Sequence, residues 1–485
     1  MDNLLKYLEK IDHINYVINV LRWEMDTTAP KKSFDYLIDV STKYELEVFD
    51  LVTSKQYIKL IDDVINSEDF DKLDEVERVY INKLKDEYVK FIRVPKDFYE
   101  EYAKLKSNSL NAWVEAKDKN DYLIFKPYLT KMIDMTKKYY RYMYPDSNKL
   151  YDNMLNDYEE GVTSDTIDKL FEELKPEVIE LVKNLKVNNL EEVKNTHSND
   201  RLLEIARYLL NYIGFDNSRG TLGIYSHGYT SKFNNNDVRI TFNNKANIFD
   251  FISTIIHEGG HGIFEQNLGS NLSKYGSYDI DKYALHESQS RFFENVLGRN
   301  KNFYIPIYEK LKKMLKIDMD IDDFIKYFND AKASLVRTEA DELTYCLHII
   351  IRYEIERDLF NDKLSTEDLV EVWNKKYYDY LGVEVTSDSE GILQDMHWSD
   401  GSFGYFPSYL LGSIFDGMLL EVINEKLGDV DTLLKEGRIK EITKFLNDNI
   451  HEYGGAYNIC EVSRRVCGKE LDVKPLINYF KKKYK

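Results

Sequence analysis

The sequence predicts a mainly α-helical fold with a large apolar core, and three observations support this prediction. Helix breakers are rare, since the 485 residues include only 8 Pro and 22 Gly. Long stretches carry apolar residues at helical spacing. No Gly/Ser-rich or Pro-rich linker, low-complexity run or repeat of roughly 20–50 residues interrupts them. The length alone allows one large domain or several.

Residues 1–200 are expected to be almost wholly helical. The segments 35–55 and 164–185 are both amphipathic. Ser164 with Asp165 is a suitable N-cap for the second segment, because a side-chain oxygen there can accept hydrogen bonds from free backbone amides of the first turn.

The pattern changes at 214–245, where turn residues surround two short runs. The runs are GIYSHGY at 223–229 and DVRITF at 237–242. The second run alternates apolar with polar side chains, as a half-buried strand does. We therefore expect the two runs to pair as a small antiparallel ribbon.

Helical spacing returns from residue 246 to the end of the chain. Residues 248–267 keep apolar side chains at helical spacing, and only Gly259 and Gly260 lower the helix propensity. The main interruption is TSDSEGILQDMHWSDGSFGYFPSYLLG at 386–412, which is expected to be a loop. Loops of this polar and aromatic composition carry function more often than helices do.

The stretch HEGGH places two histidines, His257 and His261, four residues apart, with Glu258 directly after the first. From the composition, the probability of finding this pattern by chance in the chain is about 0.03 or less. Positions four apart share one face of a helix, so both imidazoles point the same way. Glu258 is rotated by about 100° and can flank a metal without ligating it. The pattern indicates a metal site, the alternative being two histidines within a core helix.

A metal held by two histidines of one helix needs a third protein ligand and an open position for water. The segment 283–298 is expected to be a helix with Glu287 near its start, 26 residues after His261. Other residues of ligating type within reach are Asp279, Asp281, His286 and Glu294. Glu287 could instead be a first-turn acid that interacts favourably with the helix dipole. Spacing alone leaves these alternatives open.

Charge and composition exclude several classes of function. The net charge of −19 argues against nonspecific binding to nucleic acid or to anionic membranes. No run of about 18 or more apolar residues is present, and the N-terminus lacks the pattern of a signal peptide, so we expect neither a membrane span nor a leader. Cys346, Cys460 and Cys467 are too few for a disulfide framework and are interpreted as buried thiols. These features predict a cytoplasmic protein.

Motifs in order along the chain resemble those of the carboxypeptidase Taq family of zinc metallocarboxypeptidases. They are LRWEMDTTAP at 21–30, DVRIT at 237–241, HEGGH at 257–261, HESQS at 286–290, VRTEADELTY at 336–345, IRYEIE at 351–356 and GILQDMHWSDGSFGYFPSYLLG at 391–412. The family usually has His-Pro-Phe where this chain has His227, Gly228 and Tyr229. His227 is kept as a substrate-binding candidate, whereas the other two changes concern the shape of a substrate subsite. A smaller departure is Glu24 with Asp26, where the family usually shows Trp-Asp.

The resemblance implies that His257, His261 and Glu287 hold one zinc ion, for which cobalt or manganese could substitute, and that Glu258 is the general base. It implies a mostly helical single fold over residues 1–485 with a deep substrate cleft, in which residues 1–200 form a helical N-terminal part and 201–485 carry the zinc site. It also implies a homodimer that removes single C-terminal residues from peptides with broad preference. Zinc-bound water ionises near neutral pH, and Glu258 could accept its proton and pass it to the leaving amine.

Further catalytic candidates lie in the segment 386–412. His397 could donate a hydrogen bond to the oxyanion, with Asp395 or Gln394 orienting it, or it could only pack the loop. Tyr405 and Tyr409 are phenol donors in the same segment, and one of them could assist the tetrahedral intermediate.

A carboxypeptidase must also recognise the terminal carboxylate of its substrate, a task that suits a bidentate guanidinium. The candidates are Arg337 and Arg352, ranked equally, and then Arg239. Each has another explanation, because Arg352 could pair with Glu356 one helical turn later, Arg337 with acids close to it in sequence, and Arg239 with Asp237.

Two other functions share parts of this pattern. An oligoendopeptidase would use the same chemistry on internal peptide bonds and would not require a free C-terminus. A zinc-stabilised helical scaffold would have no need of a base at Glu258.

Overall fold

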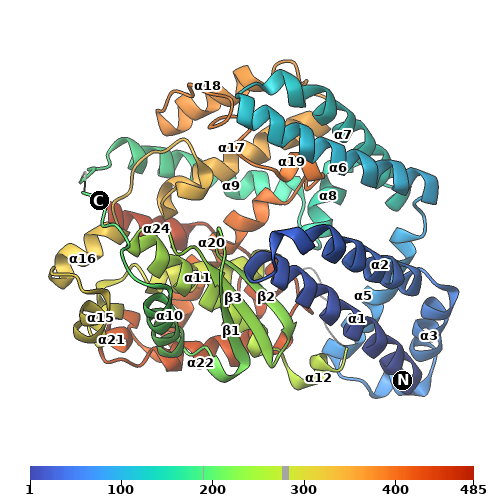
Figure 1. Ribbon diagram of the computed structural model, residues 1–485, viewed down its shortest axis with the longest axis horizontal. Coiled ribbons are helices and arrows are strands. Elements are labelled where there is room, and N and C mark those ends of the chain that lie inside the picture. Colours follow the sequence, from blue (N-terminus) through green and yellow to red (C-terminus); the bar gives the residue numbers. More distant parts are fainter. Residues whose placement is uncertain (189, 276–282) are drawn as a thin grey trace.

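The structure is a computed structural model that describes residues 1–188, 190–275 and 283–485. Helices dominate the described chain, and a three-stranded sheet lies near its centre (Figure 1). The helices before the sheet are α1 (Asp2–Thr27), α2 (Phe34–Val52), α3 (Lys55–Ile65), α4 (Glu68–Lys72), α5 (Glu75–Phe91), α6 (Lys96–Lys119), α7 (Tyr122–Met143), α8 (Leu150–Tyr158), α9 (Ser164–Lys183) and α10 (Asn199–Ile213). Those after it are α11 (Ile248–Gln266), α12 (Ser270–Ser273), α13 (Tyr283–Arg291), α14 (Lys301–Tyr304), α15 (Tyr308–Leu315), α16 (Ile321–Phe328), α17 (Glu342–Phe360), α18 (Leu369–Leu381), α19 (His397–Asp400), α20 (Phe406–Leu427), α21 (Val430–Lys435), α22 (Ile439–Asn449), α23 (Ile459–Val462) and α24 (Lys474–Tyr484).

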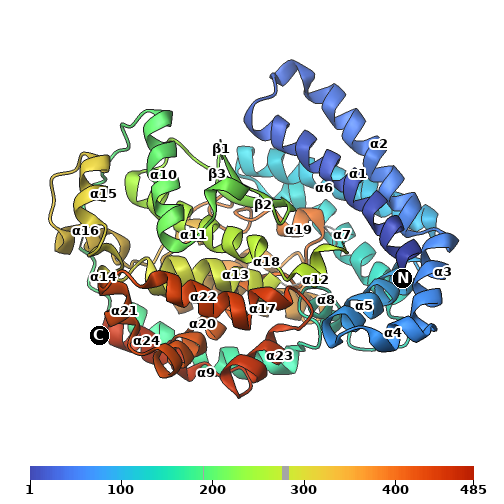
Figure 2. The same ribbon diagram turned by 90° about the horizontal axis from the view of Figure 1, so that it is seen from below.

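Helices on two sides of the molecule enclose a central layer. Helices α1 and α2 lie together along one side, and α10, α15 and α16 lie on the other (Figure 2). The sheet, α11 and α13 lie between these groups, and one cluster of buried apolar side chains extends from Leu4 in α1 to Phe480 in α24. The predicted mainly helical class is confirmed. The division of the chain at residue 200 stays a prediction.

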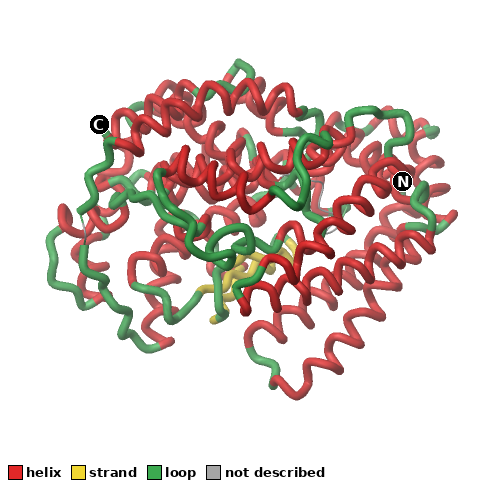
Figure 3. Tube along the Cα trace, turned by 90° about the horizontal axis from the view of Figure 1, so that it is seen from above, coloured by secondary structure: helices red, strands yellow, loops and turns green. Residues whose placement is uncertain are grey.

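The sheet differs from the expected two-stranded ribbon. Its order is β1 (Gly220–Ile224), β3 (Asp237–Phe242), β2 (Tyr229–Asn234), and the strands lie together beside the helices (Figure 3). β2 pairs with β3 in the antiparallel sense, whereas β1 pairs with β3 in parallel. The run 223–229 is therefore not one strand, because the turn residues in its middle end β1 and begin β2.

Several boundaries also differ from the sequence prediction. Thr163, not Ser164, caps α9, since its side chain accepts a hydrogen bond from the backbone amide of Thr166. The segment 386–412 is only partly a loop, because it contains α19 and the first turns of α20. In α20, Pro407 lies in the first turn, where a missing backbone amide costs no helical hydrogen bond.

The cysteines and one long helix complete the comparison with the sequence. Cys346 is buried as expected, but Cys460 and Cys467 are half-buried. Within the described residues, α20 is the one helix long and apolar enough to cross a membrane by length and composition. Most of it, 78% of the apolar window, is buried inside the protein, as in the core helix of a large domain.

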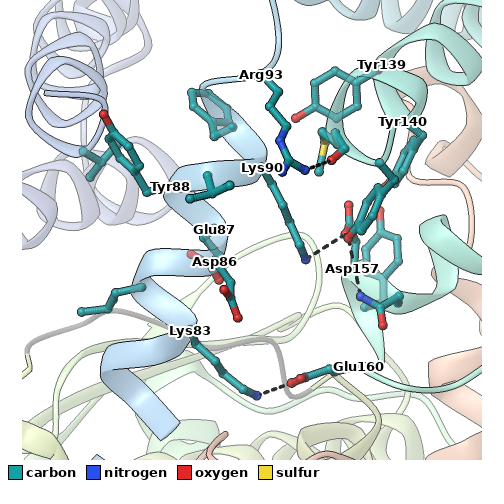
Figure 4. Close-up of a pocket in the computed structure, with 18 of the residues that line it drawn as sticks. Lys83, Asp86, Glu87, Tyr88, Lys90, Arg93, Tyr139, Tyr140, Asp157 and Glu160 are labelled. Carbon is teal, nitrogen blue, oxygen red and sulfur yellow. Dashed lines mark hydrogen bonds and ion pairs between the residues drawn. The ribbon is translucent and has the colours of Figure 1, made fainter. Parts of the chain in front are cut away.

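Two cavities matter for the site. The larger, of about 1580 Å³, is lined by residues of β2, α11, α13 and the segment 397–409. The smaller, of about 810 Å³, lies among α5, α6, α7 and α8, where Lys83 pairs with Glu160 and Lys90 lies near Asp157 (Figure 4). Gly401 lines this smaller cavity, so the segment around it runs between the two.

Close helix packing explains Gly260 of HEGGH, which the sequence shows only as a weak helix former. A Cβ atom on Gly260 would lie 2.7 Å from the carbonyl oxygen of Gln289 and from Cα of Ser290 in α13. On the other side of α13, a Cβ on Gly412 of α20 would lie 2.7 Å from the carbonyl oxygen of Ala284. The backbone of α13 is thus held closely between α11 and α20, at the turn that carries Glu287.

We expect Gly260→Ala to lower the free energy of unfolding by about 1–3 kcal/mol, because the new methyl group meets backbone that cannot move aside. This loss exceeds the gain in helix propensity, which is at most about 1 kcal/mol. Gly259→Ala is the matched comparison, since its Cβ would meet the side-chain ends of Ile213 and Leu210, which can shift. Urea unfolding of the metal-free variants measures both effects, and a Gly260→Ala variant as stable as wild type would contradict the packing argument.

Candidate active site

The larger cavity brings together most of the residues singled out from the sequence. His257, Glu258 and His261 enter it from α11 and Glu287 from α13. The further candidates that line it are His227, Arg337, His397, Tyr405 and Tyr409. Arg352 and Arg239 are not among the described residues that line it.

Three ligating atoms converge in this cavity. Oε2 of Glu287 lies 4.0 Å from Nε2 of His257 and 3.6 Å from Nε2 of His261. The two imidazoles face the same side because the histidines are one helical turn apart. Among the described residues, these three form the one group of at least three metal-ligating side chains with mutually close ligand atoms.

The donor set fits a divalent metal ion. In a tetrahedral site with metal–ligand distances of about 2.0–2.2 Å, ligand atoms are roughly 3.3 Å apart, so the observed distances need only small side-chain movements. Two imidazole nitrogens and one carboxylate oxygen also leave a coordination position for water or substrate. Asp279 and Asp281, considered as alternative ligands, lie outside the described residues, and His286 and Glu294 have other roles.

Glu294 orients His257. The Nδ1 atom of His257 donates to Oε2 of Glu294 over 2.9 Å, which leaves Nε2 directed toward Glu287. Burial opposes a charge on His257, but the hydrogen bond to Glu294 and the neighbouring carboxylates raise its pKa to about 9. A metal at Nε2 must therefore displace a proton, which makes metal binding dependent on pH.

Arg291 orients Glu287, the third candidate ligand. Its Nε donates to Oε1 of Glu287 over 2.6 Å, so the other carboxylate oxygen faces the histidines. Although burial favours the neutral acid, Arg291 and the two imidazoles hold the pKa of Glu287 well below its usual range. Arg291 is four residues after Glu287 and Glu294 is seven after it. In the sequence, this helical spacing indicates that both residues lie on the same side of the helix as Glu287. From there, Arg291 binds Glu287 and Glu294 binds His257.

His261 is held differently from His257. Its Nδ1 is buried and has no hydrogen-bond partner. Its ring instead stacks on His286 at a centroid distance of 4.3 Å, and Nε2 of His286 donates to Oε1 of Glu265 over 2.8 Å. His286 thus supports the candidate ligand His261 by ring contact, while its own Nε2 is bound to Glu265.

Glu258 lies beside the ligand group and is 6% exposed. The Thr230 hydroxyl of β2 donates to its Oε2 over 2.7 Å, an interaction that no pattern in the sequence indicates. Gly228 packs against the same carboxylate, since a Cβ there would lie 3.3 Å from Oε1 of Glu258 and 2.3 Å from Cγ2 of Thr254. A side chain at position 228 would therefore require Thr254 to move.

His397, Tyr405 and Tyr409 form an aromatic wall of the cavity. The ring of Tyr405 lies 5.6 Å from that of His397 and 4.9 Å from that of Tyr409. Burial, reinforced by nearby arginines, lowers the pKa of His397 to about 4, and its Nδ1 has no hydrogen-bond partner. Burial also raises the pKa of both tyrosines. All three are uncharged hydrogen-bonding groups near neutral pH.

Asp395 binds two arginines and does not orient His397 as expected. Oδ1 accepts from Nε and Nη2 of Arg337 over 3.0 and 2.9 Å, and Oδ2 accepts from Nε of Arg352 over 2.6 Å. Burial would raise the pKa of Asp395, but Arg352 and Arg337 hold it well below the usual range. Gln394 also serves the arginines, because its Oε1 accepts from the backbone amide of Arg337 and from Nη2 of Arg352.

The three candidate arginines therefore have different positions. Arg337 reaches the cavity, whereas Arg352 is fully buried behind it and braces Asp395. Arg352 does not form the helical pair with Glu356 that its spacing suggested; its ion pair is with Asp395. Arg239 binds Asp237 through two hydrogen bonds of 2.9 and 2.8 Å and lies over the ring of Phe233. This is the pairing with Asp237 that the sequence offered as the alternative to substrate binding.

Comparison with known proteins supports the same interpretation over the whole chain. The family model described as carboxypeptidase Taq (M32) metallopeptidase matches residues 3–484. Carboxypeptidase 1 of Bacillus subtilis is 37% identical over 98% of this chain and 96% of its own length. Thermostable carboxypeptidase 1 of Pyrococcus furiosus is 31% identical over 99% of this chain and 97% of its own.

The fold agrees with this relationship. A solved structure of the Pyrococcus furiosus carboxypeptidase has a TM-score of 0.93 and 28% identity, and the match covers 100% of this chain and 98% of that one. Membership of this metallopeptidase family implies a divalent metal and peptide substrates, and the convergent His-His-Glu group is where such a metal fits. The chain thus belongs to the carboxypeptidase Taq (M32) metallopeptidase family and is a metallocarboxypeptidase.

Proposed function

We propose that the protein is a zinc-dependent carboxypeptidase that removes C-terminal residues from peptides with broad preference. The observation that carries this proposal is the convergence of His257, His261 and Glu287 beside Glu258, in a cavity that Arg337 also lines. Two imidazoles, one carboxylate and an open position are typical of catalytic zinc, and cobalt or manganese could replace it. A metal bound there supplies Lewis acidity, which activates water and polarises a carbonyl group.

Glu258 is proposed as the general base. Its carboxylate lies next to the ligating residues without belonging to them, and the Thr230 hydroxyl fixes one of its oxygens. The other oxygen is left to accept a proton from the attacking water and to return it to the leaving amine. Replacing the carboxylate with an amide removes this basicity while keeping the shape.

His397 and the neighbouring phenols are proposed to stabilise the oxyanion. An uncharged imidazole or phenol can donate one hydrogen bond to the negative oxygen that forms during peptide hydrolysis. Burial favours this role because a donor held away from bulk water interacts more strongly with a developing charge. Tyr405 is the first candidate for the phenol, and Tyr409 and His227 are proposed to contact the peptide.

Arg337 is proposed to bind the terminal carboxylate. Arg337 and Arg352 share the single charge of Asp395, so this group of three keeps one net positive charge next to the cavity. Of these two arginines, only Arg337 lines the cavity, and Arg352 keeps Asp395 in place behind it. The earlier candidate Arg239 is bound to Asp237 and is left out of this role.

The state and location of the protein complete the proposal. Family resemblance supports a homodimer, and three unpaired cysteines support a cytoplasmic location. The −19 charge supports the absence of nucleic-acid and membrane partners.

The ligand and base roles can be separated by metal analysis. We expect Glu287→Ala to lose most bound zinc, because two imidazoles alone hold the metal weakly, whereas Glu258→Gln should keep one zinc per chain and lose turnover. Chelation should abolish activity in the wild type, and zinc, cobalt or manganese should restore it. The measurements are metal content by mass spectrometry and release of C-terminal residues from short peptides. Equal loss of metal in both variants would show that the assigned roles are wrong.

Arg337→Ala should lose most activity on peptides with a free C-terminus and keep its zinc. Removal of the guanidinium leaves the substrate carboxylate unpaired in a buried place, at a cost of about 2–5 kcal/mol in kcat/KM. Peptides with an amidated C-terminus should resist the wild type for the same reason. Hydrolysis of amidated and free-acid peptides at equal rates would instead favour an oligoendopeptidase.

His397→Ala should lower kcat by roughly 10²–10³ if the imidazole donates to the oxyanion. The pKa of His397 is depressed to about 4, so its imidazole gains a proton only as the pH falls toward that value. The ratio of wild-type to variant kcat should therefore be the same at pH 6 and at pH 8. A ratio that changes with a midpoint near 6.5, the ordinary value for histidine, would contradict the assignment of an uncharged donor.

A further inference from the structure

The segment 397–405 carries His397 at one end and Tyr405 at the other, and it runs between the two cavities. Trp398 packs on Trp373 and Phe403 packs on Phe360, so apolar contacts hold the segment against the core. Such contacts are not directional and fix burial better than orientation. The orientation of the two candidate catalytic side chains therefore depends on hydrogen bonds.

Both ends of this segment are bound by one buried carboxylate on α17. Oε1 of Glu356 accepts from Nε1 of Trp398 over 2.7 Å, next to His397. Oε2 accepts from the backbone amide of Gly404 over 2.8 Å, next to Tyr405. Glu356 has no exposed surface. A buried carboxylate is costly unless its lone pairs are satisfied, so these hydrogen bonds and the position of the carboxylate depend on each other.

The third partner of Glu356 connects it to another part of the chain. The hydroxyl of Tyr151 in α8 donates to Oε2 over 3.0 Å. Gly404 also lies against α8, because a Cβ on it would be 2.9 Å from the carbonyl carbon of Met154, and its φ of +90° favours glycine. The carboxylate thus joins α17, α8 and the segment at one point.

We propose that Glu356 is a positioning residue that holds His397 and Tyr405 in their reactive orientation. The inference rests on the proposed function, in which these two side chains act on the oxyanion. Glu356 does not reach the cavity and acts only through Trp398 and Gly404.

The chain offers a matched control on the same helix. Glu354 is also a largely buried carboxylate with three donors, Nζ of Lys175 and Lys376 and the hydroxyl of Tyr380, over 2.7, 2.5 and 2.7 Å. None of these partners belongs to the segment 397–405. Glu356→Gln and Glu354→Gln therefore remove the same charge from α17, but only the first disturbs the candidate catalytic side chains.

The test compares these two variants at pH 8, above the pKa of about 7 to which burial raises Glu356. We expect Glu356→Gln to lower kcat by about 10²-fold, as misplacement of catalytic groups by about 1 Å does, with KM and zinc content unchanged. Glu354→Gln should keep the wild-type kcat even if its thermal stability falls as much. Unchanged kcat in Glu356→Gln, or an equal loss in both variants, would overturn the proposal.

Trp398→Phe provides a second test in case Glu356→Gln does not fold. It removes one donor to Glu356 and keeps an aromatic ring against Trp373, so a lower kcat at constant KM supports the proposal and a wild-type kcat overturns it. Hydrogen exchange of the amides in 397–405 reports on the segment without any substrate, and it should accelerate in the Glu356 and Trp398 variants but not in Glu354→Gln. If the wild type releases no C-terminal residue, the proposed function fails, while the exchange rates still show whether Glu356 holds the segment.

Discussion

The close approach of α13 to α11 is the constraint on which the candidate site depends. The candidate ligands His257 and His261 come from α11 and Glu287 comes from α13, so a close approach of the two helix backbones brings their ligand atoms together. Gly260 on one side of α13 and Gly412 on the other allow this contact, since a Cβ on either would lie 2.7 Å from backbone atoms of α13. Gly260 lowers the helix propensity of α11, but the absence of a side chain there lets α13 approach closely enough to bring Glu287 to the histidines.

Buried charges are the second feature of the site, and each is paired with an opposite charge or with hydrogen-bond donors. Glu287 pairs with Arg291, Glu294 with His257, and Asp395 with two arginines. A single buried charge would be expensive, but paired charges tolerate burial when their hydrogen bonds are satisfied. The pairs also fix side-chain orientation. In Glu287, for example, one carboxylate oxygen binds Arg291, and the other is therefore directed toward the two histidines. The same ion pairs that offset the free-energy cost of burying these charges therefore also hold the reactive side chains in place.

The helical class and the shared helix face of His257 and His261 could be predicted from the sequence, because both depend on local spacing. Spacing left several candidates for a third ligand, and Glu287 came only from the resemblance of HESQS to a family motif; the structure brings its carboxylate close to the two imidazoles. Roles that depend on tertiary burial could not be predicted. Arg337 and Arg352 look equivalent in sequence, yet one reaches the cavity and the other lies behind it. The parallel pairing of β1 with β3 was missed for the same reason, since strand direction is set by the path of the chain between the strands.

The two stretches that depart from the family pattern, 227–229 and 24–26, contact each other in the structure. Tyr229, where the pattern has Phe, donates its hydroxyl to Oδ2 of Asp26 over 2.7 Å. Asp26 belongs to the other departing stretch, at the end of α1, and the ring of Trp23 in the same helix lies 6.3 Å from that of Tyr229. Glycine in place of proline at position 228 adds conformational freedom to the unfolded chain and so weakens the turn. A hydrogen bond from the next residue to α1 restores a constraint on that turn from outside it. In this chain, the cavity edge beside Glu258 is thus supported by a contact between β2 and α1.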